Sequence, residues 1–240
     1  MFLGDKNGRH KKIEQQLTHS LGLNRRPVAV AFVDEAASVP KFEGLQPSGC
    51  SYWRLAGEGR SFYTEQSDHQ NCVIGAHTHN IQLAEAKQKE LGEKLGFMSE
   101  IGYIRMEEVA KIPQIPFHPK KIVYTPLSDA KSTPDVVIVA AKPAKLMLGT
   151  EAAMRAGISA QLQALGRPTC MAIPAAMAGG VTASTGCIGN RTYTGIGDDE
   201  LYMAIPGKDL EQFCEALATI VSANAILSEY HQGRKAELTR

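Results

Sequence analysis

Two stretches of this chain repeat one order of residues around cysteine, and this repeat constrains the fold more than any other feature. The first stretch runs from Cys50 to Cys72 and the second from Cys170 to Cys187. In both, an alanine and then a glycine stand between the two cysteines, with Gly59 and Gly179 at the same offset from the leading cysteine, and an Ile-Gly pair closely follows the trailing cysteine. Core packing alone does not require thiols to recur with the same flanking residues. The repeat therefore indicates that both stretches serve one chemistry.

Each stretch also predicts the same local structure. The residues after Cys50 are typical of a short helix, a glycine stop and a strand at 61–64 that leads to the next cysteine. Thr169 stands where it would cap a helix from Cys170 to Ala178, and a strand at 181–184 follows. We therefore expect two related units, each with the order Cys-helix-Gly-strand-Cys.

The rest of the chain alternates between helix and strand patterns. Ile13, Leu17 and Leu21 recur at four-residue spacing, which predicts an amphipathic helix. The β-branched run at 135–141 is typical of a strand that is covered on both faces. Further strands are expected at 27–33, 122–124 and 201–205, and further helices at 81–96, 144–156, 159–165 and 208–230. This alternation predicts an α/β fold, with a mixed sheet flanked by helices.

The length of the chain bounds its domain organisation. Its 240 residues are enough to bury a core without disulfides. Three prolines between Ile112 and Pro119 favour an extended crossover over a helix. We expect a single α/β domain over residues 1–240, with two pseudo-repeated halves at about 1–112 and 120–240.

Composition excludes several classes of function. The net charge is +1 and no basic stripe stands out, which argues against nucleic-acid binding. No run approaches the roughly 18 apolar residues of a membrane span, and a signal segment is not evident, so we expect a cytoplasmic protein without a membrane partner. In that reducing compartment an odd number of cysteines favours metal ligation or reactive thiols. Cys214 lies on the apolar stripe of a helical segment and is expected in the core.

Several segments together resemble a known family. They are the strand beginning Pro27-Val28, Cys50 with Trp53 to Ala56, His69 to Gly75 with His79-Asn80, Pro134 to Val137, and Gly186 to Arg191. Over roughly Leu21 to Leu217 the chain resembles the domain-of-unknown-function 169 family. The resemblance implies archaeal and anaerobic bacterial relatives, and cysteines at the positions of Cys50, Cys72, Cys170 and Cys187. It implies no reaction.

The chemistry must therefore be inferred from the thiols. Four thiolates form the complete ligand set of a [4Fe–4S] cluster or of a tetrahedral zinc site. Structural zinc sites usually take their ligands as close pairs, and none of these four cysteines has such a partner. The leading hypothesis is thus an iron–sulfur redox protein or oxidoreductase component. Its cluster ligands would be Cys50, Cys72, Cys170 and Cys187.

Neighbouring residues suit the same hypothesis. Backbone without Cβ can approach inorganic sulfide and donate N–H hydrogen bonds, as Gly75, Gly186 and Gly189 are placed to do. Helix starts at Cys50 and Cys170 are expected to lower the pKa of these thiols. Arg191 would add positive charge to a cofactor site.

Histidines near Cys72 are compatible with other functions. His69 and His79 flank this thiol, so one of them is a candidate cofactor ligand or a base in a thiol enzyme that uses Cys72 or Cys187. A mononuclear site would take Cys50, His69, Cys72 and His79. A metal- or tetrapyrrole-binding accessory protein and purely structural thiols are the remaining readings. The sequence does not decide whether a substrate is turned over.

The expected partners follow from the leading hypothesis. They are a redox partner protein or a small-molecule substrate. Long helices at both ends of the chain are compatible with a homodimer.

Overall fold

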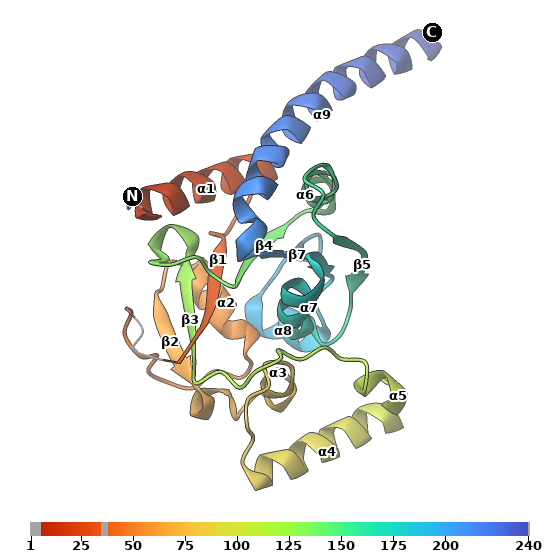
Figure 1. The fold of residues 1–240 in the computed structure, drawn as a ribbon. Helices are drawn as coiled ribbons and strands as arrows, with labels where there is room; N and C mark the ends of the chain where they lie inside the picture. Colours follow the sequence, from red (N-terminus) through yellow and green to blue (C-terminus); the bar gives the residue numbers. More distant parts are fainter. Residues whose placement is uncertain (1–5, 35–37, 240) are drawn as a thin grey trace.

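The computed structural model describes residues 6–34 and 38–239, which form a sheet with helices on both faces (Figure 1). The order of the strands across the sheet is β2-β3-β1-β4-β7-β6-β5. Their bounds are β1 Val28–Val33, β2 Phe62–Glu65, β3 Lys121–Pro126, β4 Val136–Ala141, β5 Ala160–Leu165, β6 Val181–Ser184 and β7 Leu201–Pro206. The α/β class is as predicted, and strands from both sides of the proline-rich segment share this sheet.

The prediction of a mixed sheet is wrong for the six neighbouring strands β2, β3, β1, β4, β7 and β6. Each of them pairs antiparallel with the next. Within the described residues, parallel pairing is confined to the edge, where β5 lies beside β6. A continuous apolar run such as β4 has the same sequence pattern in a parallel sheet and in an antiparallel sheet covered on both faces. The pattern therefore revealed the burial of β4 and not the direction of its neighbours.

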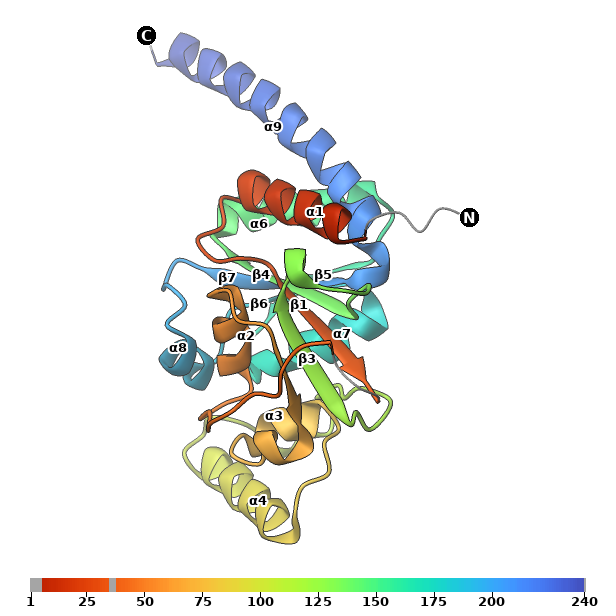
Figure 2. The same ribbon diagram turned by 90° about the vertical axis from the view of Figure 1, so that its left-hand side faces the viewer.

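Side chains of the central strands alternate between two cores. On β4, Val136 and Ile138 face one core, and Val137 and Val139 face the other. One face is covered by α1 (Lys6–Leu21), α6 (Pro143–Arg155) and the start of α9 (Leu210–Leu238), as Figure 2 shows. The predicted stripe Ile13, Leu17 and Leu21 of α1 is buried there. The opposite core contains Cys50 and Cys170.

The elements that carry the cysteines lie on this second face. Cys50 is the first residue of α2 (Cys50–Gly57), and Cys72 is the N-cap of α3 (Val73–Thr78). Cys170 lies in the 3₁₀ turn η3 (Thr169–Met171), which leads into α7 (Ala172–Gly179). Cys187 is the N-cap of α8 (Ile188–Thr194). The strands β2 and β6 stand between the two cysteines of their stretches, in the order that the sequence predicted.

Two predicted helices differ in the structure. Residues 159–165, predicted as a helix, contain β5, because Ala160 pairs with Val181 and Gln161 with Thr182 of β6. Ala, Gln and Leu are good helix formers, but helix propensity is a small energy per residue and sheet pairing outweighs it. The charged helix expected at 81–96 is α4 (Glu85–Glu100), which starts later in the chain.

A small helical lobe lies at one end of the molecule. It consists of α4 and the short α5 (Met106–Val109), which stand away from the sheet in Figure 1. Every residue of α4 is at least partly exposed, and its main neighbour is α3. Ile112 to Pro119 returns from this lobe without regular structure, as predicted.

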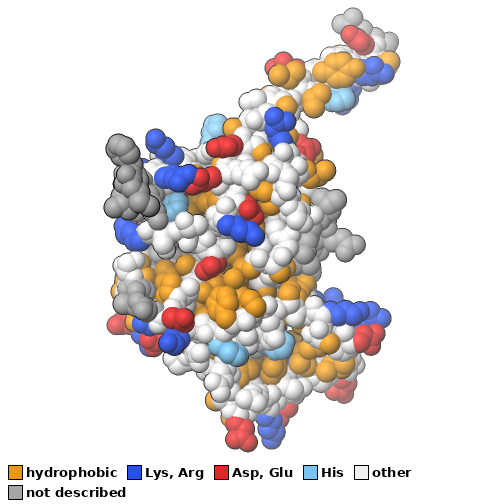
Figure 3. Space-filling view, viewed as in Figure 1, with side chains coloured by type: hydrophobic (Ala, Val, Ile, Leu, Met, Phe, Trp, Pro, Cys, Tyr) orange, Lys and Arg blue, Asp and Glu red, His pale blue; other side chains and the backbone are white. Residues whose placement is uncertain are grey.

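At the other end, α9 extends beyond the body. Its first part is buried around Phe213 and Leu217, whereas all residues from 225 to 239 are exposed. Figure 3 shows apolar side chains along this projecting part, where Ile226, Leu227 and Tyr230 are exposed. By length and composition alone, the helical stretch Gly207–Leu238 would also suffice to cross a membrane.

Candidate four-cysteine site

The four cysteines of the two stretches line one cavity of about 370 Å³. The leading cysteines, Cys50 and Cys170, are 6% and 4% exposed. The trailing cysteines, Cys72 and Cys187, are half-buried. Thiols from four separate segments, far apart in the sequence, therefore face a common space. Cys214 is buried in the core on the other face of the sheet, as predicted.

The thiols influence one another electrostatically. Burial raises the pKa of Cys50 well above its ordinary value, and the thiols of Cys170, Cys72 and Cys187 raise it further. Burial is also the main cause of the raised pKa of Cys170, with Cys72 and Cys187 contributing. The expectation that helix starts lower these two pKa values is wrong, because desolvation in the core outweighs the helix dipole. Both thiols are neutral at pH 7, so a metal that binds them must displace their protons.

Part of the cavity wall comes from the helical lobe. It is mainly apolar and includes Leu95 and Met98 from α4, Val109 from α5, and Ile112. The lobe is tied to the segment that precedes Cys170. There, Arg167 donates a hydrogen bond to Glu108 at 3.2 Å, and its guanidinium lies 4.8 Å from the centre of the Tyr103 ring. The lobe therefore supplies apolar side chains to the same cavity that the thiols line.

The three predicted glycines have different roles. A Cβ at Gly75 would lie 2.8 Å from Sγ of Cys72, so any larger residue there would force this sulfur to move. Gly189 lines the cavity, but a Cβ there would meet only Tyr193, at 3.8 Å. The N–H of Gly186 donates to Ser184 Oγ at 3.2 Å, so it is already engaged and does not serve the predicted role.

The two predicted histidines lie behind the cavity wall. His69 Nε2 is 2.8 Å from Thr64 Oγ1, and in the part of the chain that the structure describes neither His69 nor His79 lines the cavity. Burial lowers the pKa of His69 to about 3 and that of His79 to about 4. Both imidazoles are neutral at pH 7. Such low pKa values make them weak bases for activating Cys72 or Cys187.

The predicted mononuclear set is not assembled. Across residues 6–34 and 38–239, no three His, Cys, Asp or Glu side chains are grouped closely enough to hold one metal ion. His69 turns towards Thr64 and packs against the Tyr52 ring, with the ring centres 5.1 Å apart. The loop thus brings Cys72 to the cavity and leaves its neighbouring imidazoles in the core.

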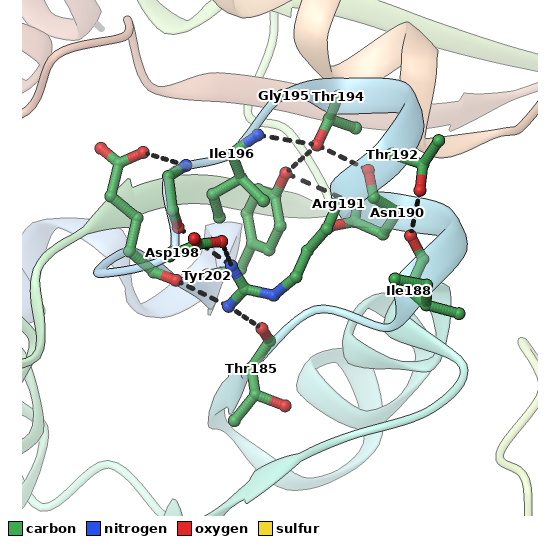
Figure 4. Close-up of polar contacts among 12 residues, drawn as sticks. Thr185, Ile188, Asn190, Arg191, Thr192, Thr194, Gly195, Ile196, Asp198 and Tyr202 are labelled. Carbon is green, nitrogen blue, oxygen red and sulfur yellow. Dashed lines mark hydrogen bonds and ion pairs between the residues drawn. The ribbon is translucent and has the colours of Figure 1, made fainter.

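Arg191 has a structural role in place of the predicted cofactor contact. Its guanidinium donates hydrogen bonds to the carbonyl oxygens of Gly197 at 2.9 Å, Thr185 at 2.5 Å and Glu200 at 3.2 Å (Figure 4). These bonds hold the loop that connects α8 to β7. The charge of Arg191 is therefore committed to the backbone beside α8.

Sequence reasoning missed three residues near the thiols. Thr78 acts to lower the pKa of Cys170, and Asn190 acts to lower that of Cys50, against the larger effect of burial. Tyr124 on β3 is fully buried, and among the described residues its hydroxyl has no hydrogen-bond partner. Thr78 and Asn190 each lie about one or two helical turns after a trailing cysteine. This spacing is a sequence pattern from which such neighbours can be predicted. Tyr124 is marked by no motif.

These observations fit an anionic, sulfur-rich group at the cavity. The four thiols supply a complete ligand set. Gly75 leaves room for the sulfur of Cys72.

Comparison with known proteins identifies the family. A search of curated proteins and of solved structures found no match. The sequence profile of the family described as Uncharacterised ArCR, COG2043 (DUF169) matches residues 16–216, a span that includes all four cysteines of the cavity. The chain therefore belongs to the DUF169 family.

Proposed function

We propose that this protein holds a [4Fe–4S] cluster on Cys50, Cys72, Cys170 and Cys187, and that it acts as a redox protein or as the redox component of an oxidoreductase. The observation that carries this proposal is that four thiols from four separate segments line one cavity. Ligands that are supplied singly need a folded scaffold to hold them together. A large α/β domain provides that scaffold, and a small zinc-stapled fold does not.

A cavity lined by four thiols from separate segments suits a cluster better than a single ion. A zinc ion needs its four ligands within about 2.0–2.3 Å of one point. In the described residues no three candidate ligands are grouped for a single ion, although the four thiols share a cavity. In a [4Fe–4S] cluster each cysteine binds a different iron, so the sulfur atoms surround a larger core. The cavity shared by the four thiols supports the binding of this larger group.

The protein around the thiols suits an electron carrier. When bound, the cluster supplies one-electron chemistry whose potential depends on burial and on hydrogen bonds to sulfur. Cys50 and Cys170 are buried, and α4 and α5 contribute apolar side chains to the cavity wall. The partner is a redox protein or a small-molecule substrate. We place this chemistry in the cytoplasm, where free thiols persist.

We also infer that the two cysteine stretches are paired halves of one site. Each stretch supplies one buried leading cysteine and one half-buried trailing cysteine. Each trailing cysteine is the N-cap of a short helix, α3 or α8. The equal division of the ligands between the two stretches supports a duplicated unit, in which both copies bind one group together.

Anaerobic purification tests the proposal. Protein from iron-supplied cells should be brown, contain iron and acid-labile sulfide in equal amounts, and give an electron paramagnetic resonance signal when reduced. Replacing Cys50, Cys72, Cys170 or Cys187 by serine should reduce or abolish cluster retention in every case. Cys214→Ser is the matched control, because Cys214 is a buried thiol on the other face of the sheet, and it should retain the cluster.

Other outcomes would overturn the proposal. Zinc as the bound metal would indicate a structural site. Colourless, metal-free protein with an activity that depends on Cys72 or Cys187 alone would indicate a thiol enzyme. A bound tetrapyrrole that survives all four substitutions would indicate an accessory protein.

A further inference from the structure

The cavity that the four cysteines line has a second, apolar part. Most of the lining comes from residues other than these cysteines, and the volume of about 370 Å³ lies within the usual range of small-molecule pockets. The helical lobe supplies apolar side chains, among them Leu95, Met98 and Ile112, and α8 supplies Ile188 and Tyr193. The cavity therefore offers an apolar surface in addition to its sulfur atoms.

This apolar surface is only partly covered by the protein itself. No residue of α4 or α5 is buried, although Leu95 and Met98 of α4 are apolar. On α8, Ile188 is 69% exposed and Tyr193 is 45% exposed. Helices in proteins gain most of their stability by packing an apolar face against another surface. An apolar ligand in the cavity would bury these side chains and remove them from water.

The charged side chains that line the cavity are already paired. Among the described residues they are Lys94, Glu108 and Arg167. Lys94 Nζ is 2.5 Å from Oε1 of Glu90, and Arg167 Nη2 is 3.2 Å from Oε2 of Glu108. A charged ligand would lose its hydration there without gaining an opposite charge that is free to pair with it, which is costly. The charges of the cavity therefore suit an uncharged ligand.

Two apolar side chains of the cavity stand next to cysteines in the sequence. Ile188 directly follows Cys187, and Ile74 lies two residues after Cys72. Both isoleucines line the same cavity as the thiols. A molecule in contact with them would lie close to two of the proposed cluster ligands.

We propose that the apolar part of this cavity binds an uncharged, mainly apolar organic molecule beside the four thiols. This molecule is the substrate class of the proposed redox site, so the inference rests on the proposed function. Its recognition depends on apolar contact with the lobe and α8, and on the absence of charge.

Three probes of nearly equal size test the charge of the ligand. Benzyl alcohol is uncharged at neutral pH, whereas benzoate carries a negative charge and benzylamine a positive one. Binding is measured by titration of the methionine methyl signals in nuclear magnetic resonance, which also shows whether the probe lies at Met98. Benzyl alcohol should bind about tenfold more tightly than either charged probe.

Two substitutions in the lobe test its location. Met98→Gln keeps a long side chain and a good helix former but makes the cavity wall polar. It should weaken the binding of benzyl alcohol by about tenfold. Met106→Gln is the matched control, because Met106 is a 52% exposed methionine of the same lobe that lies outside the cavity lining, and it should bind the alcohol normally. Urea unfolding shows that both variants fold.

Cluster-loaded protein tests whether the ligand lies beside the cluster. Reduction of the cluster should speed the relaxation of the protons of bound benzyl alcohol, because the unpaired electron spin lies close to them. Cluster-free protein gives the reference relaxation rate.

Several results would overturn the inference and leave the cluster proposal standing. They are no binding of benzyl alcohol, equal affinities for the three probes, equal effects of Met98→Gln and Met106→Gln, and displacement of the alcohol when the cluster assembles. If the alcohol binds at Met98 but anaerobically purified protein holds no cluster, the proposed function fails, and the apolar pocket stands without its redox role.

Discussion

The backbone N–H of Cys187 donates a hydrogen bond to Oγ1 of Thr169, with the two atoms 2.6 Å apart. Thr169 is 0% exposed and immediately precedes Cys170. One buried side chain thus joins the beginning and the end of the second cysteine stretch. The sequence predicted that Thr169 caps the following helix, but the hydroxyl serves the backbone of the trailing cysteine instead. This bond sets the position of Cys187 relative to Cys170.

Thr169→Val should therefore loosen the position of Cys187. The change keeps the shape of the side chain and leaves a buried N–H without an acceptor, which costs about 1–3 kcal/mol of unfolding free energy. Cluster retention in air should fall together with stability. Thr169→Ser keeps the hydroxyl and should retain the cluster. Equal cluster lifetimes in the Val and Ser variants would show that this bond does not position the ligand.

Gly75→Ala should displace the sulfur of Cys72. Its Cβ would lie 2.8 Å from Sγ, closer than real contacts allow, and such overpacking typically costs about 1–3 kcal/mol. The cluster content of the purified variant should drop strongly. The measurement is iron and sulfide per chain, together with urea unfolding.

Gly189→Ala is the matched control for this substitution. Gly189 also lines the cavity, near the start of α8, but a Cβ there meets only Tyr193 at an ordinary 3.8 Å. This variant should keep its cluster. If both alanine variants behave alike, the close approach of Gly75 to Cys72 has no importance for binding.

The buried His79 should make the protein sensitive to acid. Its pKa in the folded state is lowered from 6.5 to about 4 by burial, so the unfolded chain takes up a proton first as pH falls. The stabilising contribution is complete above pH 6.5 and is lost as the pH falls towards 4. Between pH 7 and pH 5 this group alone should cost about 2 kcal/mol of unfolding free energy.

Urea unfolding of cluster-free protein at several pH values checks this expectation. His79→Leu removes the titrating group, so its stability should fall less steeply with acid than that of the unchanged protein. His69, with its pKa lowered to about 3, should account for much of the remaining slope. Parallel curves for the two proteins would contradict the assignment to His79.

The projecting part of α9 should bind a second copy of this chain. An isolated helix of this length is marginally stable in water, yet residues 225–239 are exposed and include Ile226, Leu227 and Tyr230. Glu229 and Lys235 give the same segment charges of both signs, so two copies in antiparallel contact can pair them.

Light scattering after size exclusion measures this association. The unchanged protein should have the mass of a dimer, and Leu227→Asp with Tyr230→Asp should have the mass of a monomer. Ser228→Asp adds a charge to the same exposed turn and should remain dimeric. A monomeric mass for the unchanged protein over a wide range of concentration would refute the expectation.

Local patterns were the reliable part of the sequence analysis. The apolar periodicity of Ile13, Leu17 and Leu21 identified α1, and the β-branched run identified β4 as buried on both faces. The prediction of a helix at 159–165 is wrong because local helix preference is outweighed by the pairing of β5 with β6, which is a contact between separate segments. The prediction of strand direction is wrong for a related reason. The direction depends on the path of the connections between strands and not on the residues of one strand.

The sequence by itself determined the strand and helix order around each cysteine and the four thiols to consider. Only the tertiary structure decided that these thiols line one cavity and that His69 and His79 stay buried outside it. The physical reason is that residue spacing governs contacts within a helix or strand, whereas contacts across a sheet depend on how the whole chain packs. Desolvation likewise arises only in the packed core, and it reversed the expected pKa direction at Cys50 and Cys170.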